Sequence, residues 1–96
     1  MKCIFNGAQR KAGRFEKDGK EIVYDNYYVT LSTLPISKDW HVGYESFVAK
    51  VSAKNAPAVF GTTADNLEAL MVDNIMCECE CEFNRYGNID TIVFER

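Results

Sequence analysis

The pair Asp18-Gly19 most constrains the fold of this chain, because it joins two stretches of strand-like sequence. A type I′ turn needs positive φ at both central residues, and Asp-Gly is one of the pairs that favour it. A two-residue turn fixes the register, so we expect Phe15 opposite Ile22 and Gly13 opposite Tyr24. Side-chain alternation along the two strands then sorts the hairpin into two faces.

The two predicted faces of the hairpin differ in composition. One face combines cations with aromatic and apolar side chains: Lys11, Phe15, Lys17, Lys20, Ile22, Tyr24 and Tyr28. The opposite face carries Ala12, Arg14, Glu16, Glu21, Val23, Asp25, Tyr27, Val29 and Leu31. Lysines beside flat rings suit a single nucleic-acid strand, whose phosphates attract cations and whose unstacked bases stack on aromatic side chains. The alternative is an ordinary amphipathic hairpin whose rings pack under a loop.

A chain of 96 residues with 47% hydrophobic content is expected to form one domain, residues 1–96, around a single modest core. No apolar run approaches the roughly 20 residues of a membrane span. The first residues also lack the apolar length of a signal peptide. We therefore expect a cytoplasmic protein with no membrane contact, in which the four cysteines are reduced thiols.

The net charge of −3 is distributed unevenly along the chain. Six basic and two acidic residues give residues 1–20 a local charge of +4, so the remainder carries −7. A basic edge on an acidic body attracts a polyanion without making the protein basic overall. An acidic surface that meets a basic protein partner accounts for the same asymmetry.

The hydrophobic periodicity predicts five strands and one short helix. A long first strand with bulges or bends at Gly7 and Gly13 precedes strands over residues 20–33, 44–53, 75–83 and 89–94. Residues 34–43 are expected as a connection, because Pro35 cannot continue a central strand. The helix is expected to begin at a cap, Thr62 or Thr63, and to end near Asn74. This is the order of the OB-fold, a five-stranded Greek-key barrel with a helix between its third and fourth strands.

The fourth predicted strand alternates thiols with carboxylates: Cys77, Glu78, Cys79, Glu80, Cys81 and Glu82. Structural zinc sites usually combine a Cys-x2-Cys turn with a second, distant pair of ligands. Successive cysteines on an extended strand lie about 6.6 Å apart, which is a poor geometry for converging on one ion. We expect these cysteines, and Cys3, to be small buried hydrophobic residues, with no metal and no cofactor. The glutamates form either a solvated edge or an acidic surface for a protein partner.

The connection over residues 34–43 holds the only Trp and the only His of the chain. Trp40 is suited either to stacking a base or to covering the open end of a barrel. His41 has no nucleophile or carboxylate at a recognisable spacing, so we expect a surface residue. Because the sequence shows no nucleophile–base pair, phosphate loop or metal-ligand constellation, we do not expect an enzyme.

Three stretches carry a resemblance to a known family: Gly13-Arg14-Phe15-Glu16-Lys17-Asp18-Gly19-Lys20, Tyr24-Asp25-Asn26-Tyr27 and Phe83-Asn84-Arg85-Tyr86-Gly87-Asn88. The pattern spans most of the chain and resembles the small OB-fold single-stranded-DNA-binding proteins of phages and mobile elements, including the filamentous-phage type. The resemblance implies that tyrosines stack bases and that basic hairpin residues contact phosphates: Tyr24, Tyr28, Arg10, Lys11, Arg14, Lys17 and Lys20. It also implies that Arg85 and Tyr86 lie in the loop that reaches the ligand. The acidic C-terminal half departs from this pattern.

We therefore expect a protein of phage or mobile-element origin that binds single-stranded DNA, or RNA, with little sequence preference. The candidate binding residues are Arg10, Lys11, Arg14, Phe15, Lys17, Lys20, Tyr24, Tyr28, Trp40, Arg85 and Tyr86. The alternative is a phage-encoded inhibitor or adaptor, for example an anti-CRISPR-like protein, that binds a host protein through Glu78, Glu80, Glu82 and Asp90. Long hairpins with free strand edges also favour a homodimer.

Overall fold

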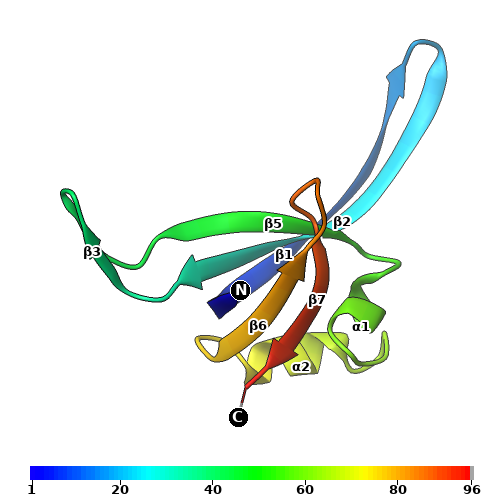
Figure 1. Ribbon diagram of the computed structural model, residues 1–96. Helices are drawn as coiled ribbons and strands as arrows, with labels where there is room; N and C mark the ends of the chain where they lie inside the picture. The colour runs from blue at the N-terminus through cyan, green and yellow to red at the C-terminus, as the bar shows by residue number, and fades with distance from the viewer. Residues whose placement is uncertain (96) are drawn as a thin grey trace.

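The largest element of the computed structural model is a five-stranded antiparallel sheet (Figure 1). The structure describes residues 1–95, with the side chain of Lys38 excepted. The sheet has the spatial order β5-β2-β1-β6-β7 and consists of β1 (Lys2–Lys17), β2 (Lys20–Thr33), β5 (Ser46–Ser52), β6 (Glu78–Phe83) and β7 (Ile89–Phe94). The other elements are β3 (Ile36–Lys38), β4 (His41–Gly43), α1 (Ala56–Val59) and α2 (Leu67–Asp73). The chain is therefore mostly β, as the sequence predicts.

The hairpin formed by β1 and β2 has the predicted turn and register. Asp18 and Gly19 have φ values of 55° and 75°, the left-handed conformation that a type I′ turn requires at both positions. Phe15 pairs with Ile22, and the pairing continues without a shift back to Gly7. The Asp-Gly turn therefore fixes which side chains share a face over the whole outer half of the hairpin.

β1 bends where it passes from the body of the protein into this hairpin. The register to β2 shifts between Phe5 and Gly7, so the predicted bulge at Gly7 is confirmed. The extra residue, Asn6, donates a hydrogen bond of 2.6 Å from Nδ2 to Ser32 Oγ. A bulge increases the local twist of a strand, and beyond it the two strands leave the sheet as a ribbon.

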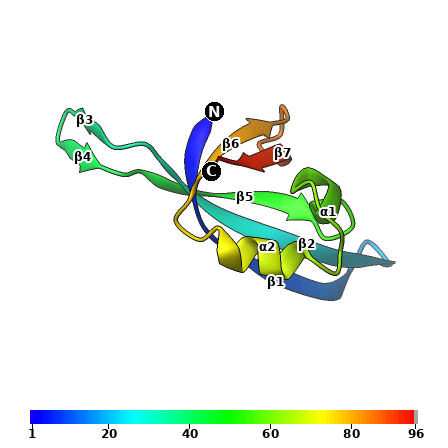
Figure 2. The same ribbon diagram turned by 90° about the horizontal axis from the view of Figure 1, so that it is seen from below.

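Residues 11–24 form this ribbon, which we call the β1–β2 arm. β5 pairs with β2 only from residue 26 onward and β6 pairs with β1 only at residues 2–4, so the strands of the arm pair with each other alone. The arm extends from one end of the molecule in both views (Figures 1 and 2). The Cα radius of gyration is 15.0 Å, whereas a compact domain of this length would have about 12.5 Å.

A second, shorter hairpin replaces the connection expected over residues 34–43. Its strands β3 and β4 pair Ser37 with Val42, and its turn places Asp39 and Trp40 at φ values of 40° and 63°. Pro35 precedes β3, where β2 has already ended. The β3–β4 hairpin projects from the end of the molecule opposite the arm (Figures 1 and 2). Its three-residue strands and its Asp-Trp turn give too weak a sequence signal for prediction.

The core lies between the inner face of the sheet and the segment that holds the two helices. Phe5 is fully buried at its centre, and its ring meets the rings of Phe60 and Phe94 edge-on at 6.1 and 5.3 Å. The remaining core residues are Cys3, Val29, Leu31, Ala49, Val51, Ala56, Leu67, Met71, Cys79, Cys81, Ile89 and Ile92. The prediction that Cys3, Cys79 and Cys81 act as buried hydrophobic residues is confirmed, while Cys77 is only partly buried.

Both helices lie in the connection between β5 and β6. α2 buries Leu67 and Met71, as the i, i+4 spacing predicts. It begins after Asn66, so the predicted caps at Thr62 or Thr63 are wrong. α1 is a single turn that the sequence did not reveal, because its proline follows a cluster of polar loop-type residues. Within residues 1–95 we find no helix with the length and apolarity to cross a membrane.

β5 and β7 are the two edge strands of the sheet, and no pairing joins them within residues 1–95. Their inner faces nevertheless contribute to the same core through Val51 and Ile89. The ring of Phe47 in β5 also lies 6.0 Å from that of Phe83 at the end of β6. The sheet therefore curves around its core without the closed ladder of the expected barrel.

Candidate nucleic-acid interface

The outer face of β1, β2 and β5 gathers lysines and rings on three adjacent strands. In the register, Tyr28 stands opposite Lys50 of β5 on one side and Gln9 of β1 on the other. Within residues 1–95, the side chains that alternation places on this face of the three paired strands include no carboxylate. We call the following residues the lysine face: Lys11, Phe15, Lys17, Lys20, Ile22, Tyr24, Tyr28 and Lys50.

Two aromatic rings of the arm lie on this face and remain exposed. The Tyr24 side chain lies over Gly13 on the neighbouring strand. A Cβ added at Gly13 would stand only 2.6 Å from Tyr24 Oη. The centroids of Phe15 and Tyr24 are 6.1 Å apart, and these residues are 48% and 37% exposed. A bulge or bend is predicted at Gly13, but this glycine pairs with Tyr24 without a shift of register, so there is no bulge here. The rings form an open platform beside the lysines of the arm rather than packing under a loop.

Nearer the body, Tyr28 and Lys11 continue the same face. Lys11 Nζ lies 5.2 Å from the centre of the Tyr28 ring, which is a cation–π distance. Tyr28 is half-buried and lies outside the core, whereas its neighbour Tyr27 packs against the core from the inner face. A shallow groove along this part of the sheet is lined by Asn6, Gly7, Ala8, Gln9, Lys11, Tyr28, Thr30 and Val48.

The two arginines of the hairpin lie on the opposite face and are paired with carboxylates. Arg10 donates two hydrogen bonds to Asp25, from Nε at 2.8 Å and from Nη2 at 2.6 Å. Arg14 Nη1 lies 3.2 Å from Glu21 Oε1. The hydrogen bonds from Arg10 lower the pKa of the Asp25 carboxyl, and the pairing raises the pKa of Arg10. The structure therefore does not bring Arg10 and Arg14 together with the lysines, none of which has an ion pair within the described chain.

Arg85 and Tyr86 occupy the tight turn between β6 and β7. Asn84 Oδ1 accepts hydrogen bonds from the backbone N–H groups of Tyr86 and Asn88, at 2.9 and 3.0 Å, which fixes the turn. The Arg85 guanidinium lies 4.9 Å from the centre of the exposed Tyr86 ring and donates a hydrogen bond to its hydroxyl. This turn lies at the same end of the sheet as the arm (Figures 1 and 2). A groove there is lined by Asn26, Lys50, Val51, Ser52, Asn55, Ala58, Val59, Asn84, Asn88, Ile89 and Asp90.

Trp40 lies apart from the other candidate residues. It stands at the tip of the β3–β4 hairpin and is 106% exposed, so it covers no end of the sheet. His41, predicted as a surface residue, is also exposed. Because this hairpin and the arm project from opposite ends of the molecule, Trp40 does not belong to the lysine face (Figure 2).

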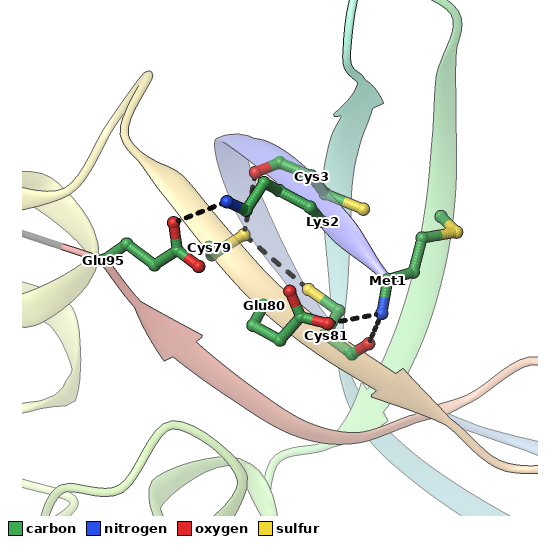
Figure 3. A network of polar contacts seen from close by, with 7 residues as sticks. All are labelled: Met1, Lys2, Cys3, Cys79, Glu80, Cys81 and Glu95. Atoms are coloured by element: carbon green, nitrogen blue, oxygen red, sulfur yellow. Dashed lines mark hydrogen bonds and ion pairs between the residues drawn. The ribbon is translucent and has the colours of Figure 1, made fainter.

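The alternating segment of β6 directs thiols inward and carboxylates outward (Figure 3). Glu80 Oε1 accepts a hydrogen bond of 2.8 Å from the N-terminal ammonium group of Met1. Inside, Cys79 Sγ lies 3.7 Å from Cys81 Sγ and 3.5 Å from the carbonyl oxygen of Cys3. Burial raises the pKa of the Cys3 thiol to about 11, so the neutral thiol is favoured. No group of ligand-type side chains in residues 1–95 is arranged to hold a metal ion.

Lys50 belongs to the lysine face, although the sequence alone does not identify it as a candidate binding residue. The alternation of residues 46–52 already placed it on the polar side of its strand. Its position opposite Tyr28 follows only from the pairing of β5 with β2, which periodicity alone does not give.

Comparison with known proteins gives no relative: no family model matches this chain, and no curated protein or solved structure is similar to it. The basis for a function is therefore the site itself. It consists of a cationic, partly aromatic sheet face that runs from the tip of the arm to the body.

Proposed function

We propose that this protein binds single-stranded nucleic acid, and DNA in particular, with little sequence preference through the lysine face. The supporting observation is the separation of charge between the two sides of one ribbon. On the inner side Arg10 and Arg14 are paired with carboxylates, whereas the outer lysines have no such partners within residues 1–95. Unpaired lysines beside exposed rings suit a ligand that offers phosphates and bases together.

In this proposal the rings and the lysines bind different parts of the ligand. Phe15 and Tyr24 stack bases along the arm, and Tyr28 stacks a base near the body. Lys17 and Lys20 at the tip, with Lys11 and Lys50 nearer the body, neutralise phosphates. Stacking and charge neutralisation recognise features that every nucleotide has, so the binding carries little sequence preference.

We further propose that the sheet is an open variant of the OB-fold. Support comes from the strand order β5-β2-β1-β6-β7 and from the helices that connect β5 to β6. In OB-folds, ligands lie across the second and third strands and contact the loops after the first and fourth strands. The corresponding elements here are β2, β5, the β1–β2 arm and the turn with Arg85 and Tyr86.

The test is fluorescence anisotropy with a labelled oligothymidine at several salt concentrations. We expect binding that weakens steeply as salt rises, because phosphate contacts release counterions. Replacing Tyr24 and Tyr28 with Ala should weaken binding by about 1–3 kcal/mol for each lost stack, with the circular dichroism spectrum unchanged. Tyr44→Ala, a substitution outside the lysine face, is the matched control. No binding at low salt to oligothymidine or to oligouridine would overturn the proposal.

A further inference from the structure

The groove between β5 and the β6–β7 turn gathers asparagine side chains from three parts of the chain. Its volume is about 450 Å³, within the roughly 300–1,000 Å³ that is usual for sites that bind small organic groups. Four of the residues that line it are asparagines: Asn26 of β2, Asn55 after β5, and Asn84 and Asn88 of the turn. We call it the asparagine groove. Each asparagine amide offers two donor hydrogens and an acceptor oxygen, so the groove suits a polar ligand.

The asparagine groove is continuous with the lysine face. Asn26 pairs with Lys11, so strand alternation places it on the same side of the sheet as the lysines. Lys50, which pairs with Tyr28, also lines the groove. From β5 the groove extends to the β6–β7 turn. A nucleic-acid strand that lies on the lysine face therefore has one nucleotide next to the groove.

The amides of the groove are available to a ligand. Asn84 Oδ1 accepts two backbone hydrogen bonds of the turn, which fixes the amide and leaves Nδ2 without a partner in the described chain. Within residues 1–95, the side chains of Asn26, Asn55 and Asn88 make no hydrogen bond. Asn26 and Asn88 are half-buried. Because partly buried polar groups without partners carry a desolvation cost, a ligand that supplies partners is favoured.

The charged residues of the groove distinguish the phosphate of a nucleotide from its base. Lys50 of β5 attracts a phosphate, whereas Asp90 of β7 repels a phosphate and accepts hydrogen bonds. Neither residue has an ion pair within the described chain. Thymine and uracil have no amino group to donate to Asp90. Adenine has an amino group beside a ring nitrogen that accepts, which is the pair of atoms that an asparagine amide binds in two places.

We propose that the asparagine groove binds one base of the strand and prefers adenine. The base turns away from the lysine face into the groove, where the amides and Asp90 bind its amino group and ring nitrogens. Lys50 neutralises the neighbouring phosphate. This inference rests on the proposed function, and it adds one adenine-preferring position to a strand that is otherwise bound with little sequence preference.

The test compares three oligonucleotides by fluorescence anisotropy. They are oligothymidine, the same strand with one central dA, and the same strand with purine, which is adenine without its amino group, at that position. We expect the dA strand to bind about tenfold more tightly than oligothymidine, and the purine strand to lose this advantage. Asn88→Ala should reduce the ratio of the dA and oligothymidine affinities to about one. Asn66→Ala, which changes an exposed asparagine outside the groove that makes no cap hydrogen bond, is the matched control and should keep the ratio.

Three results with intact oligothymidine binding would overturn the adenine preference alone. They are equal affinities for the dA strand and oligothymidine, a ratio that Asn88→Ala leaves unchanged, and a purine strand that binds as tightly as the dA strand. The last result would assign the preference to stacking, and it needs no variant.

If oligothymidine does not bind, the proposed function fails and the groove is tested by itself. The probes are then the free nucleotides dAMP and dTMP, and the readout is the side-chain amide resonances of the asparagines in NMR spectra. We expect dAMP to shift the resonances of Asn26 and Asn88 and dTMP to leave them in place. Equal shifts, or none, would overturn the inference.

Discussion

At the scale of single residues, Gly13 determines where the Tyr24 ring lies. A Cβ at this position would stand 2.6 Å from Tyr24 Oη and 2.9 Å from Cζ, so Gly13→Ala must displace the ring. The φ of Gly13 is not in the left-handed region, so alanine strains no backbone. We expect the free energy of unfolding to change by less than about 0.5 kcal/mol. Oligothymidine binding should weaken by about 1–3 kcal/mol, the range for one lost stack.

The control for this substitution is Ala12→Ser, which adds an atom to the neighbouring residue on the other face of the arm. It should bind oligothymidine as the wild type does. If Gly13→Ala also binds as the wild type, the Tyr24 ring is not part of the interface.

The buried Cys3 thiol predicts a loss of stability at alkaline pH. Burial raises its pKa from an ordinary value of 9.0 to about 11, so the unfolded chain releases this proton at a lower pH than the folded chain. The stabilising contribution is therefore complete below pH 9.0 and is lost as pH rises through about 11. Urea unfolding at pH 8 and at pH 10.5 should show this decline, and Cys3→Ala should show a smaller one. An equal decline in both proteins would contradict the assignment.

At the scale of elements, the arm should unfold independently of the body. Its strands pair only with each other, so strain at its tip has little effect on β5, β6 or β7. Gly19 has a φ of +75°, and a β-branched side chain there costs roughly 1–2 kcal/mol. We expect Gly19→Val to accelerate amide hydrogen exchange over residues 11–24 while leaving exchange in β6 and β7 unchanged.

Gly87→Val is the matched control, because Gly87 has a φ of +81° in the other tight turn. It should accelerate amide hydrogen exchange around the β6–β7 turn and leave exchange in the arm unchanged. Uniform acceleration through the whole chain in Gly19→Val would show that the arm and the body unfold together.

The elements also show what the sequence can predict and why it fails elsewhere. The Asp18-Gly19 turn has a strong local signal, so the register of the longest hairpin was predictable from the chain alone. The β3–β4 hairpin was not, because Asp39-Trp40 is an unusual turn pair. Whether β5 and β7 join into a barrel depends on contacts far apart in sequence, which periodicity does not record.

The charged residues of the candidate site could also be predicted only in part from the sequence. The resemblance to single-stranded-DNA-binding proteins implies that Arg10 and Arg14 contact phosphates together with the lysines, although alternation places these arginines on the other face. Their pairing with Asp25 and Glu21 depends on diagonal neighbours across the hairpin, which become visible once the register is drawn. Lys50 joined the lysine face only through the pairing of β5 with β2.

At the scale of the whole molecule, the two projecting hairpins differ in chemistry. The arm carries lysines and rings on one face, and the β3–β4 hairpin carries exposed apolar residues at the opposite end (Figure 1). The extents of 49 × 33 × 21 Å reflect this two-ended form. It separates the surface proposed for nucleic acid from the exposed apolar residues of the β3–β4 hairpin.

The most direct test of the central claim compares the two faces of the arm by charge. Lys17→Gln and Arg14→Gln each remove one positive charge close to the tip, on opposite faces. The oligothymidine affinity of each variant would be measured by anisotropy at several salt concentrations. Each lost phosphate contact with a single strand reduces the slope of log affinity against log salt by about 0.7. We predict this reduction for Lys17→Gln and an unchanged slope for Arg14→Gln. Equal slopes in the two variants would contradict a binding surface confined to the lysine face.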